Sequence, residues 1–310
     1  MTAANTPVEP IDAATEAQEP PDEGARWALL RAIFDSPVTI FAVVVIAVVL
    51  LLAVFGELIA PYGANEINVM NQLQPPSTAH WFGTDELGRD VFSRVILSAR
   101  VSVEVSIVSV TLALLLGVTI GLTSGYFGHW VDTVGMRSMD VIFSFPVVLL
   151  ALAIVAMLGP GIVPAMIAIG VVYTPYFARI TRASVLSVRE ETYIRAARSI
   201  GAGDVRILRL HVLPNVMAPI IVQTSLSLAF AILTEAALSF LGLGVQPPQP
   251  SWGRMLFDGR GFLSEAWWMA VFPGAAILLT VLALNLIGDA MRDALDPRQR
   301  SAIESRSGNL

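Results

Sequence analysis

The chain has 310 residues, of which 55% are hydrophobic and only 14% charged, with a formal net charge of −6. Soluble domains carry about 25% charged residues, so this composition indicates a protein of the lipid bilayer. All 19 basic residues are arginine. Without lysine the chain can hold neither a P-loop nucleotide site nor a Schiff-base lysine, so any ATP chemistry must come from a partner. It has no cysteine for a disulfide, and its three histidines lack the spacing of a metal site.

The first 35 residues are rich in acidic side chains and proline. The acidic residues that precede the first arginine are Glu9, Asp12, Glu16, Glu19, Asp22 and Glu23. Because few large apolar residues accompany them, we expect residues 1–35 to form a disordered, solvated tail. The tail also lacks the basic and apolar regions of a signal peptide.

Apolar runs long enough to cross a bilayer occur six times. A hydrocarbon core of about 30 Å needs about 20 helical residues. The predicted spans are 38–55, 103–125, 141–158, 162–178, 219–241 and 267–287. Ser36 is the candidate N-cap of the first span, with Pro37 as its first helical residue.

The distribution of arginine orients these spans, because cytoplasmic segments carry an excess of basic residues near the membrane. With both termini in the cytoplasm, the only external residues among the 19 arginines are Arg89, Arg94, Arg100, Arg254 and Arg260. The inverted topology would reverse this ratio, so we expect an N-in/C-in protein. All six tryptophans fall outside the spans or at their edges, as expected for a residue that prefers the headgroup region.

Glycine and proline divide the spans further. Residues 159–161 leave room only for a turn, so the third and fourth spans should form a helical hairpin. The prolines of these two spans, which either kink them or mark helix starts, are Pro146, Pro164 and Pro175. The second span has a face of small residues for close helix contact, within the chain or against a partner, at Gly117, Gly121 and Gly125.

The cytoplasmic stretch 188–215 has the spacing of two short helices. Apolar residues recur at helical intervals on either side of a Gly-x-Gly-Asp interruption, first at Ile194, Ala197 and Ile200–Gly201 and then at Val205, Leu208 and Val212. Gly201 can adopt the left-handed conformation that ends the first helix, and Asp204 can cap the second. We therefore expect a compact knob at the membrane surface.

Residues 195–214 resemble the EAA motif of ABC importer permeases, written EAA-x3-G-x9-I-x-LP. The matching positions are Ala196, Ala197, Gly201, Leu213 and Pro214, whereas Arg195 replaces the Glu and His211 the Ile. The resemblance implies a short coupling helix that docks in a groove of an ATPase subunit. The candidate ATPase-coupling residues are Glu190, Tyr193, Arg195, Ala196, Ala197, Ser199, Gly201, Ala202, Asp204, Leu213 and Pro214. Alternatively, the arginines of this segment only pair with lipid phosphates.

A second segment, residues 80–94, resembles the signature before the second span in C-type permease subunits of the dipeptide, oligopeptide and nickel importer family. Leu87, Val91 and Val95 would form the apolar stripe of an interfacial amphipathic helix, beside residues able to form ion pairs. The segment is either an external functional signature or a structural lid without ligand contact. Its candidate residues are Phe82, Gly83, Thr84, Asp85, Gly88, Arg89, Asp90 and Arg94.

Segments that resemble the same family recur at 234–244, 246–253 and 285–297, so the resemblance covers about residues 35–298. It implies an assembly of this subunit, a second homologous permease, two ATPase subunits and an extracytoplasmic substrate-binding protein that delivers a peptide-like solute. ATP and Mg²⁺ would bind the ATPase subunits, so we expect this chain to bind no cofactor, metal or nucleic acid and not to be an enzyme. The expected location is the bacterial plasma (inner) membrane, as a multi-pass protein.

Two acidic residues fall within or beside the spans. An unpaired charge in hydrocarbon costs at least about 2.5 kcal/mol, which makes Glu104 and Glu235 candidates for the pathway. Both lie in the outer parts of their spans, which favours a position at the rim, paired with arginine or water. The resemblance includes Glu235 but not Glu104.

The spans and the resemblance together predict an all-α membrane protein of six transmembrane helices with the fold of a type I ABC importer transmembrane domain. After the tail at 1–35, we expect the first transmembrane helix and external amphipathic segment at 36–97. The five-helix permease core follows at 98–290, with the coupling loop at 179–218, and the cytoplasmic C-terminal tail at 291–310. The first span should wrap around the outside of the core.

Two rival classes lack their sequence signals. A secondary transporter predicts midplane ionisable residues and an inverted repeat, and an intramembrane enzyme needs a nucleophile–base pair within the spans. We therefore predict that the chain forms half of a translocation pathway for di- or oligopeptides. Nickel complexes, glutathione, some sugars or another small solute are the alternative cargoes.

Overall fold

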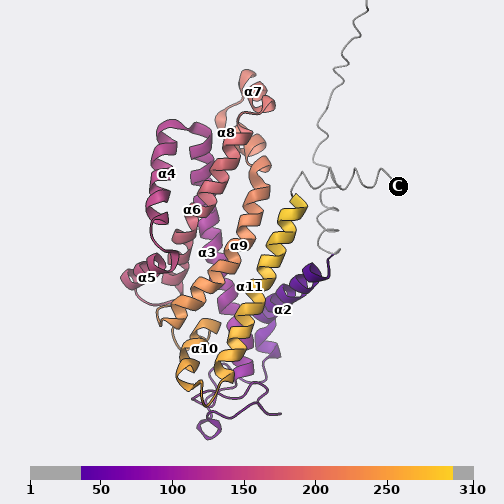
Figure 1. The fold of residues 1–310 in the computed structure, drawn as a ribbon, viewed down its shortest axis with the longest axis vertical. Coiled ribbons are helices and arrows are strands. Elements are labelled where there is room, and N and C mark those ends of the chain that lie inside the picture. Colours follow the sequence, from indigo (N-terminus) through magenta and orange to yellow (C-terminus); the bar gives the residue numbers. More distant parts are fainter. Residues whose placement is uncertain (1–35, 296–310) are drawn as a thin grey trace, which may run out of the picture.

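The computed structural model describes residues 36–295, an elongated bundle of helices (Figure 1). The predicted tail at 1–35 and residues 296–310 lie outside the described residues. Within the described range no β-strand forms, apart from one isolated bridge between Thr84 and Asp90. Figure 1 places α7 at one end of the bundle and α10 near the other, which we call the α7 end and the α10 end.

Five helices are long and apolar enough to cross a membrane. They are α2 (Pro37–Ile59), α3 (Val91–Phe127), α6 (Ile162–Val188), α9 (Met217–Phe240), which the 3₁₀ turn Pro214–Val216 extends, and α11 (Trp268–Leu295). The shorter helices are α4 (His129–Phe143), α5 (Val147–Leu158), α7 (Thr192–Ser199), α8 (Asp204–Ile207) and α10 (Trp252–Gly259). If α4 and α5 together count as one broken span, the candidate spans number six, as the sequence predicts.

The predicted span 141–158 is broken, because α4 and α5 meet at an angle of 91°. Pro146 is the N-cap residue of α5, so it marks a helix start, one of the two roles predicted for it. Pro146 is also the cause of the break: it has no N–H to donate, and its ring keeps Phe145 out of the helical conformation. Of the other two prolines, Pro164 lies in the first turn of α6, where its missing N–H costs nothing, and Pro175 lies inside α6.

The small face of α3 packs against α6. An added Cβ on Gly117 would lie 2.5 Å from the Phe177 Cβ, and one on Gly125 would lie 2.8 Å from the Val185 Cβ. At Gly121 the nearest atom would be the Ala178 carbonyl oxygen, at 2.5 Å. Of the two roles open to this face, the structure assigns packing within the chain.

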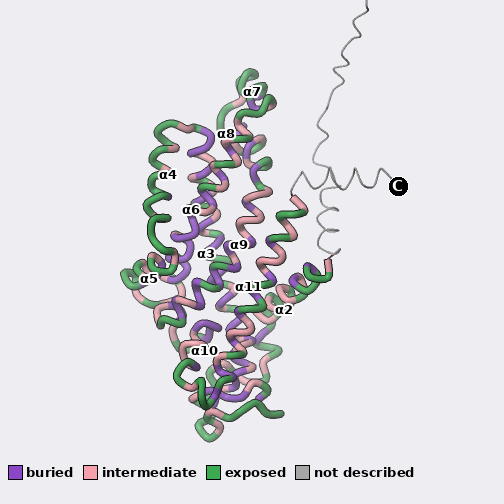
Figure 2. The backbone as a smooth tube through the Cα atoms, viewed as in Figure 1, coloured by how far each residue is buried: buried purple, intermediate pink, exposed green. Residues whose placement is uncertain are grey.

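Helix α10 and its flanks close the other end of the bundle against α3 and α9. The indole Nε1 of Trp252 donates to the carbonyl oxygen of Val95 on α3 (2.9 Å), and Gly253 lies against the backbone of Ala236 on α9. Trp252 and Trp268 are buried, so these two tryptophans serve the protein core instead of facing headgroups. In contrast, α2, α4 and α5 are largely exposed along their outer sides (Figure 2).

Candidate functional site

The segment 190–214, which we call the protruding segment, extends beyond the bundle at the α7 end (Figure 1). One side of it is anchored, because Ile194 and Ile207 are fully buried in the same core as α3 and α6. Its other side presents apolar side chains to the surroundings: Ile200 is 86% exposed and Val205 64%. An anchored helix with exposed apolar groups is suited to contact another protein.

The turn between α7 and α8 has the left-handed glycine predicted from the sequence. Gly201 has φ +82°, and its N–H donates to the carbonyl oxygen of Arg198. The predicted helix cap at Asp204 is wrong, because this side chain makes no capping hydrogen bond and Gly203 is the N-cap. Asp204 Oδ1 instead accepts a hydrogen bond from the Tyr126 hydroxyl on α3 (2.7 Å). The Asp204 carboxylate, predicted to cap α8, therefore binds a residue of α3 that is 78 positions away in the chain.

The second half of the protruding segment leads directly into α9. Helix α8 continues through a π-helical turn, Leu208–Val212, and the 3₁₀ turn Pro214–Val216. The N–H of Leu213 donates to the Leu208 carbonyl oxygen (2.8 Å), five residues back. Pro214 has no N–H, so a regular ladder cannot continue through this point. The predicted pair of short helices is present as α7 and α8, and irregular turns connect α8 to α9.

Further contacts tie this segment to the end of α3. The Arg198 guanidinium lies 5.4 Å from the Tyr126 ring centroid, and hydrogen bonding with that tyrosine raises the pKa of Arg198. Arg189 donates to the Gly125 carbonyl oxygen (2.8 Å). Of the remaining coupling candidates, Ala197 is buried, Tyr193, Ala202 and Leu213 are half-buried, and the exposed ones are Glu190, Arg195, Ala196, Ser199 and Pro214. Tyr126 was missed because nothing in its local sequence marks it.

Residues 80–90 do not form the predicted amphipathic helix. They form tight turns, and the helix begins only at Val91, with Asp90 as its N-cap accepting from the Ser93 N–H (2.8 Å). Two glycines explain this, because Gly83 and Gly88 have φ +73° and +72°. A Cβ on Gly88 would lie 1.8 Å from the Asn68 carbonyl oxygen, so these turns depend on glycine.

The charged residues of this segment bind one another. The Arg89 guanidinium contacts Asp85 (2.6 Å), and Arg94 lies 3.6 Å from Asp85 and 3.8 Å from Asp258 on α10. Burial raises the pKa of the neighbouring Glu86 carboxyl, and the charge of Asp85 adds to the effect. Each pair is largely buried, so removing one partner would leave a charge without compensation.

Other members of the signature close the fold locally. Thr84 is buried, and its carbonyl oxygen accepts from the indole of Trp268 on α11 (3.0 Å), while the Phe82 ring stacks on Phe272 at 3.8 Å. Asp90 also binds His80 (2.9 Å), a residue that the sequence did not single out. The signature residues thus hold the 60–90 segment and the start of α3 against α10 and α11.

The two candidate acidic residues occupy different environments. Glu104 is exposed on α3. Glu235 on α9 is fully buried, and its carboxylate accepts from the hydroxyls of Ser239 (2.8 Å) and Ser102 on α3 (3.5 Å). It is therefore inside the helix bundle and not at its rim, and hydroxyls take the place of the arginine or water proposed for it.

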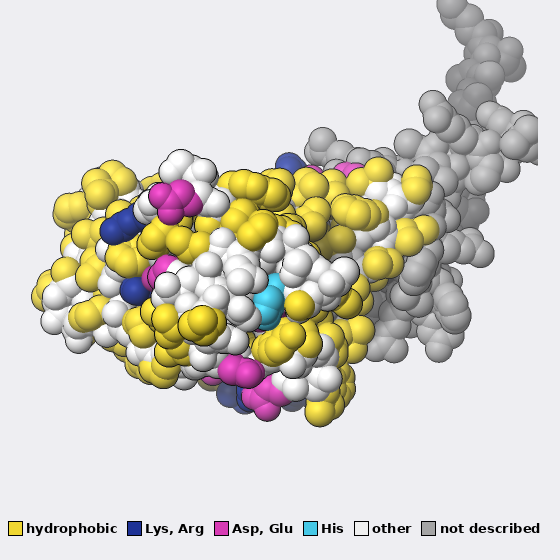
Figure 3. Space-filling model, turned by 90° about the horizontal axis from the view of Figure 1, so that it is seen from below, with side chains coloured by type: hydrophobic (Ala, Val, Ile, Leu, Met, Phe, Trp, Pro, Cys, Tyr) yellow, Lys and Arg dark blue, Asp and Glu magenta, His cyan; other side chains and the backbone are white. Residues whose placement is uncertain are grey.

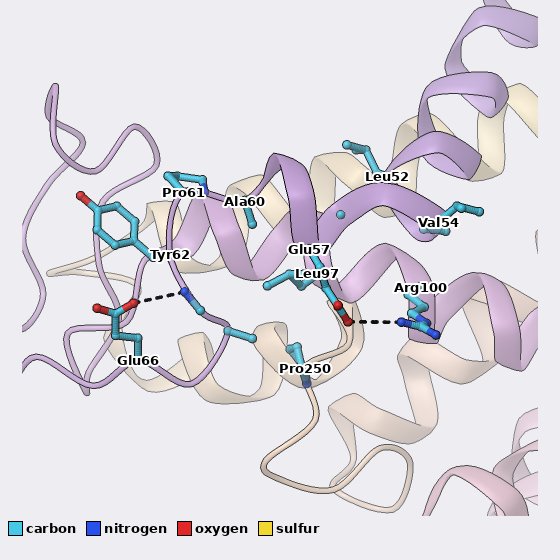
Figure 4. A pocket seen from close by; sticks show the side chains of 14 residues that line it. Leu52, Val54, Glu57, Ala60, Pro61, Tyr62, Glu66, Leu97, Arg100 and Pro250 are labelled. Carbon is cyan, nitrogen blue, oxygen red and sulfur yellow. Dashed lines mark hydrogen bonds and ion pairs between the residues drawn. The ribbon is translucent and has the colours of Figure 1, made fainter.

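A pocket of about 450 Å³ lies beside the last turns of α2 (Figure 4). The Arg100 guanidinium donates to Glu57 there (3.3 Å), and the Gly63 N–H donates to Glu66 (3.2 Å). Both members of the Glu57–Arg100 pair are well exposed, so this pair contributes little energy. Seen from below, the nearby end of the molecule shows many apolar side chains with scattered charged ones (Figure 3). No group of residues suited to hold a metal occurs within residues 36–295.

Long apolar helices around a buried core, with one broken span and a protruding segment, define a polytopic membrane protein. A family model for the inner membrane component of binding-protein-dependent transport systems matches residues 117–301. A second model, for the N-terminal transmembrane domain of oligopeptide transport permease C, matches residues 27–76.

Curated relatives match along most of their length. A dipeptide transport system permease protein of Alkalihalophilus pseudofirmus is 45% identical over 92% of this chain and 96% of its own. A probable D,D-dipeptide transport permease of Escherichia coli is 43% identical over 85% and 88%, and a glutathione transport permease of Pectobacterium atrosepticum is 43% identical over 87% and 90%. This chain belongs to the family of binding-protein-dependent transport system inner membrane components.

Membership confirms the predicted family and the predicted all-helical importer fold. The chain is a permease component of the inner membrane, and its family is not itself catalytic. The family model that matches residues 27–76 covers α2, and the one that matches residues 117–301 covers the helices from the middle of α3 onward. The 80–90 turns lie between the two matches.

Proposed function

We propose that this chain forms half of the translocation pathway of an ATP-driven importer, and that its protruding segment docks on an ATPase subunit. The observation that carries the proposal is the contrast within that segment between anchored and exposed apolar residues. Ile194 and Ile207 are buried, whereas Ile200 and Val205 are exposed. A push on the exposed side would reach α3 through the Tyr126–Asp204 hydrogen bond.

The arginine distribution supports an N-in/C-in arrangement. In that arrangement the protruding segment lies in the cytoplasm and α10 lies outside, which is the placement that ATPase docking requires. We assign the residues of the 80–94 signature a structural role, because their hydrogen bonds and ion pairs join the 60–90 segment to α11 and the start of α3 to α10. A binding protein would then meet a preformed outer surface.

The proposed assembly contains this subunit, a second homologous permease, two ATPase subunits and an extracytoplasmic binding protein. ATP and Mg²⁺ belong to the ATPase subunits. Di- or oligopeptides are the proposed cargo, since relatives carry the names of dipeptide and di/tripeptide permeases. Glutathione, itself a small peptide-like solute, is the second candidate, because two relatives are named for it.

The test compares two variants that place a charge on an exposed isoleucine. Ile200→Glu changes the protruding segment, and Ile67→Glu makes the same change at the α10 end, where Ile67 is 57% exposed. Tagged protein is purified in mild detergent, co-purifying ATPase is quantified, and uptake of labelled dipeptide by cells is measured. We expect Ile200→Glu to lose both ATPase and uptake while Ile67→Glu keeps the ATPase.

Two results would overturn the proposal. One is normal ATPase recovery with Ile200→Glu, which would place docking elsewhere. The other is a wild-type protein that purifies alone and transports in liposomes without ATP, as a secondary transporter would.

A further inference from the structure

A cavity of about 530 Å³ lies between α5, α6 and α9. This volume is within the usual range of small-molecule sites, about 300–1,000 Å³. Its lining combines apolar residues with five that can form hydrogen bonds, namely Tyr173, Tyr176, Gln223, Ser227 and Thr234. Hydrogen bonds between side chains of the lining join Tyr173 to Thr234 (3.0 Å) and Gln223 to Ser227 (3.0 Å).

The helix break lies at this cavity. Val147 and Val148, the first residues of α5 after the break, are part of the lining, and Figure 1 shows α5 turning away from α4 part-way along the bundle. Within a bilayer, broken helical backbone is tolerated only where it is buried in protein or lines water. The bend is largely exposed on this subunit, with Phe145 55% exposed and Val148 39%.

The side chains support the same conclusion independently. Gln223, Ser227 and Thr234 lie on the same side of α9, one of the membrane-spanning helices, at intervals of one turn and then two. Ser227 and Thr234 are buried and hydrogen-bonded within the chain, whereas Gln223 is half-buried at the cavity. A half-buried amide inside a span is costly against lipid and favourable against water or a polar solute. We propose that this cavity is a water-filled wall of the translocation pathway and binds the uncharged amide backbone of the transported solute.

The chemistry of the lining defines what it recognises. None of its ten lining residues carries a formal charge, while amide and hydroxyl groups both donate and accept hydrogen bonds. The Arg179–Asp140 ion pair (2.7 Å) lies one helical turn beyond Tyr176. Peptide groups are therefore bound at the cavity itself, and the charge of the solute's side chains has no partner there.

The absence of native cysteine from the sequence allows a direct test of the water content. Single cysteines replace Gln223 or Phe230, both in the lining, and the control replaces Leu115, which is 60% exposed on α3 and outside the cavity. Membranes containing the assembled complex are treated with a membrane-impermeant methanethiosulfonate reagent, and the tagged chain is analysed by mass. We expect the cavity cysteines to react about tenfold faster or more, because an apolar environment suppresses the thiolate.

A second test concerns solute binding and uses a matched pair of threonines. Thr234 and Thr119 both donate to the carbonyl oxygen four residues back (2.9 and 2.7 Å). Thr234 lines the cavity, where it is buried and also bonds the Tyr173 hydroxyl, whereas Thr119 is exposed outside it. Thr234→Val and Gln223→Leu should lower uptake about three- to tenfold, the effect of one lost hydrogen bond, equally for neutral, acidic and basic dipeptides. Thr119→Val should leave uptake unchanged.

This inference rests on the proposed function for the solute, but its failure can be separated from a failure of that function. Equal reactivity at residues 223, 230 and 115 would show a lipid-filled groove and overturn the inference, whatever the transport result. A loss of uptake restricted to one charge class would overturn the amide-recognition part. If wild-type protein imports no peptide while the cavity cysteines react, the proposed cargo fails and the aqueous wall stands.

Discussion

At the scale of single residues, Glu235 is the least ordinary feature of the bundle. A fully buried carboxyl group is costly unless its oxygens are satisfied, and here the hydroxyls of Ser239 and Ser102 donate to it. Ser239 belongs to α9 itself and Ser102 to α3. Glu235 therefore joins two membrane-spanning helices by hydrogen bonds and not by an ion pair.

We expect Glu235→Leu to destabilise the protein by about 1–3 kcal/mol, because both serine hydroxyls lose their acceptor in a buried site. Glu235→Gln keeps an acceptor oxygen and should cost about 1 kcal/mol or less. The measurement is thermal unfolding of the purified protein in detergent. Glu104→Leu, at an exposed position, is the control, and a Glu235→Leu protein as stable as the wild type would refute this account.

At the scale of elements, the contact between α3 and α6 holds the core together and carries the protruding segment. Gly117, Gly121 and Gly125 allow the two helices to touch backbone to side chain. In a membrane, where burial of apolar surface between helices gains little, such close packing is a main source of helix association. The Tyr126 hydrogen bond to Asp204 extends the same contact to the protruding segment.

A pair of glycine substitutions measures this packing. Gly121→Ala would bring a Cβ within 2.5 Å of the Ala178 carbonyl oxygen, whereas at Gly274 in α11 the nearest atom lies at 3.9 Å. We expect Gly121→Ala to cost about 1–3 kcal/mol through overpacking. Gly274→Ala should be neutral or stabilise by up to about 1 kcal/mol, because alanine favours helix. The measurement is the unfolding temperature of each variant in detergent. Equal shifts for Gly121→Ala and Gly274→Ala would show that the close approach of α3 and α6 does not contribute to stability.

At the scale of the whole molecule, the orientation of the bundle decides which end meets the ATPase. The arginine distribution places the α7 end in the cytoplasm. Thr78 at the α10 end and Thr133 near the α7 end are both exposed, so cysteines at these two positions report the orientation.

Thr78→Cys should react with a membrane-impermeant thiol reagent in intact spheroplasts, and Thr133→Cys only after the membrane is permeabilised. The unmodified chain has no cysteine, so it gives the background. The reverse pattern would invert the topology and remove the basis for docking at the protruding segment.

The sequence by itself determined the membrane class, the number and approximate limits of the spans, the turn at 159–161 and the left-handed Gly201. These follow from hydropathy and from backbone conformations that a few neighbouring residues dictate. The family could also be recognised from the sequence, since its motifs are short and local. The coupling residues remain predictions, although the structure places several of them on one protrusion.

The tertiary structure decided what depends on partners far apart in the chain. Asp204 binds Tyr126, 78 residues away, instead of capping its own helix. The turns at Gly83 and Gly88 replace an amphipathic helix because Gln74 and Asn68 pack against them. Glu235 accepts from Ser102 on α3, 133 residues away, and the cavity between α5, α6 and α9 lies where α5 bends away from α4. Local sequence specifies what a segment can do, and packing selects which distant group it meets.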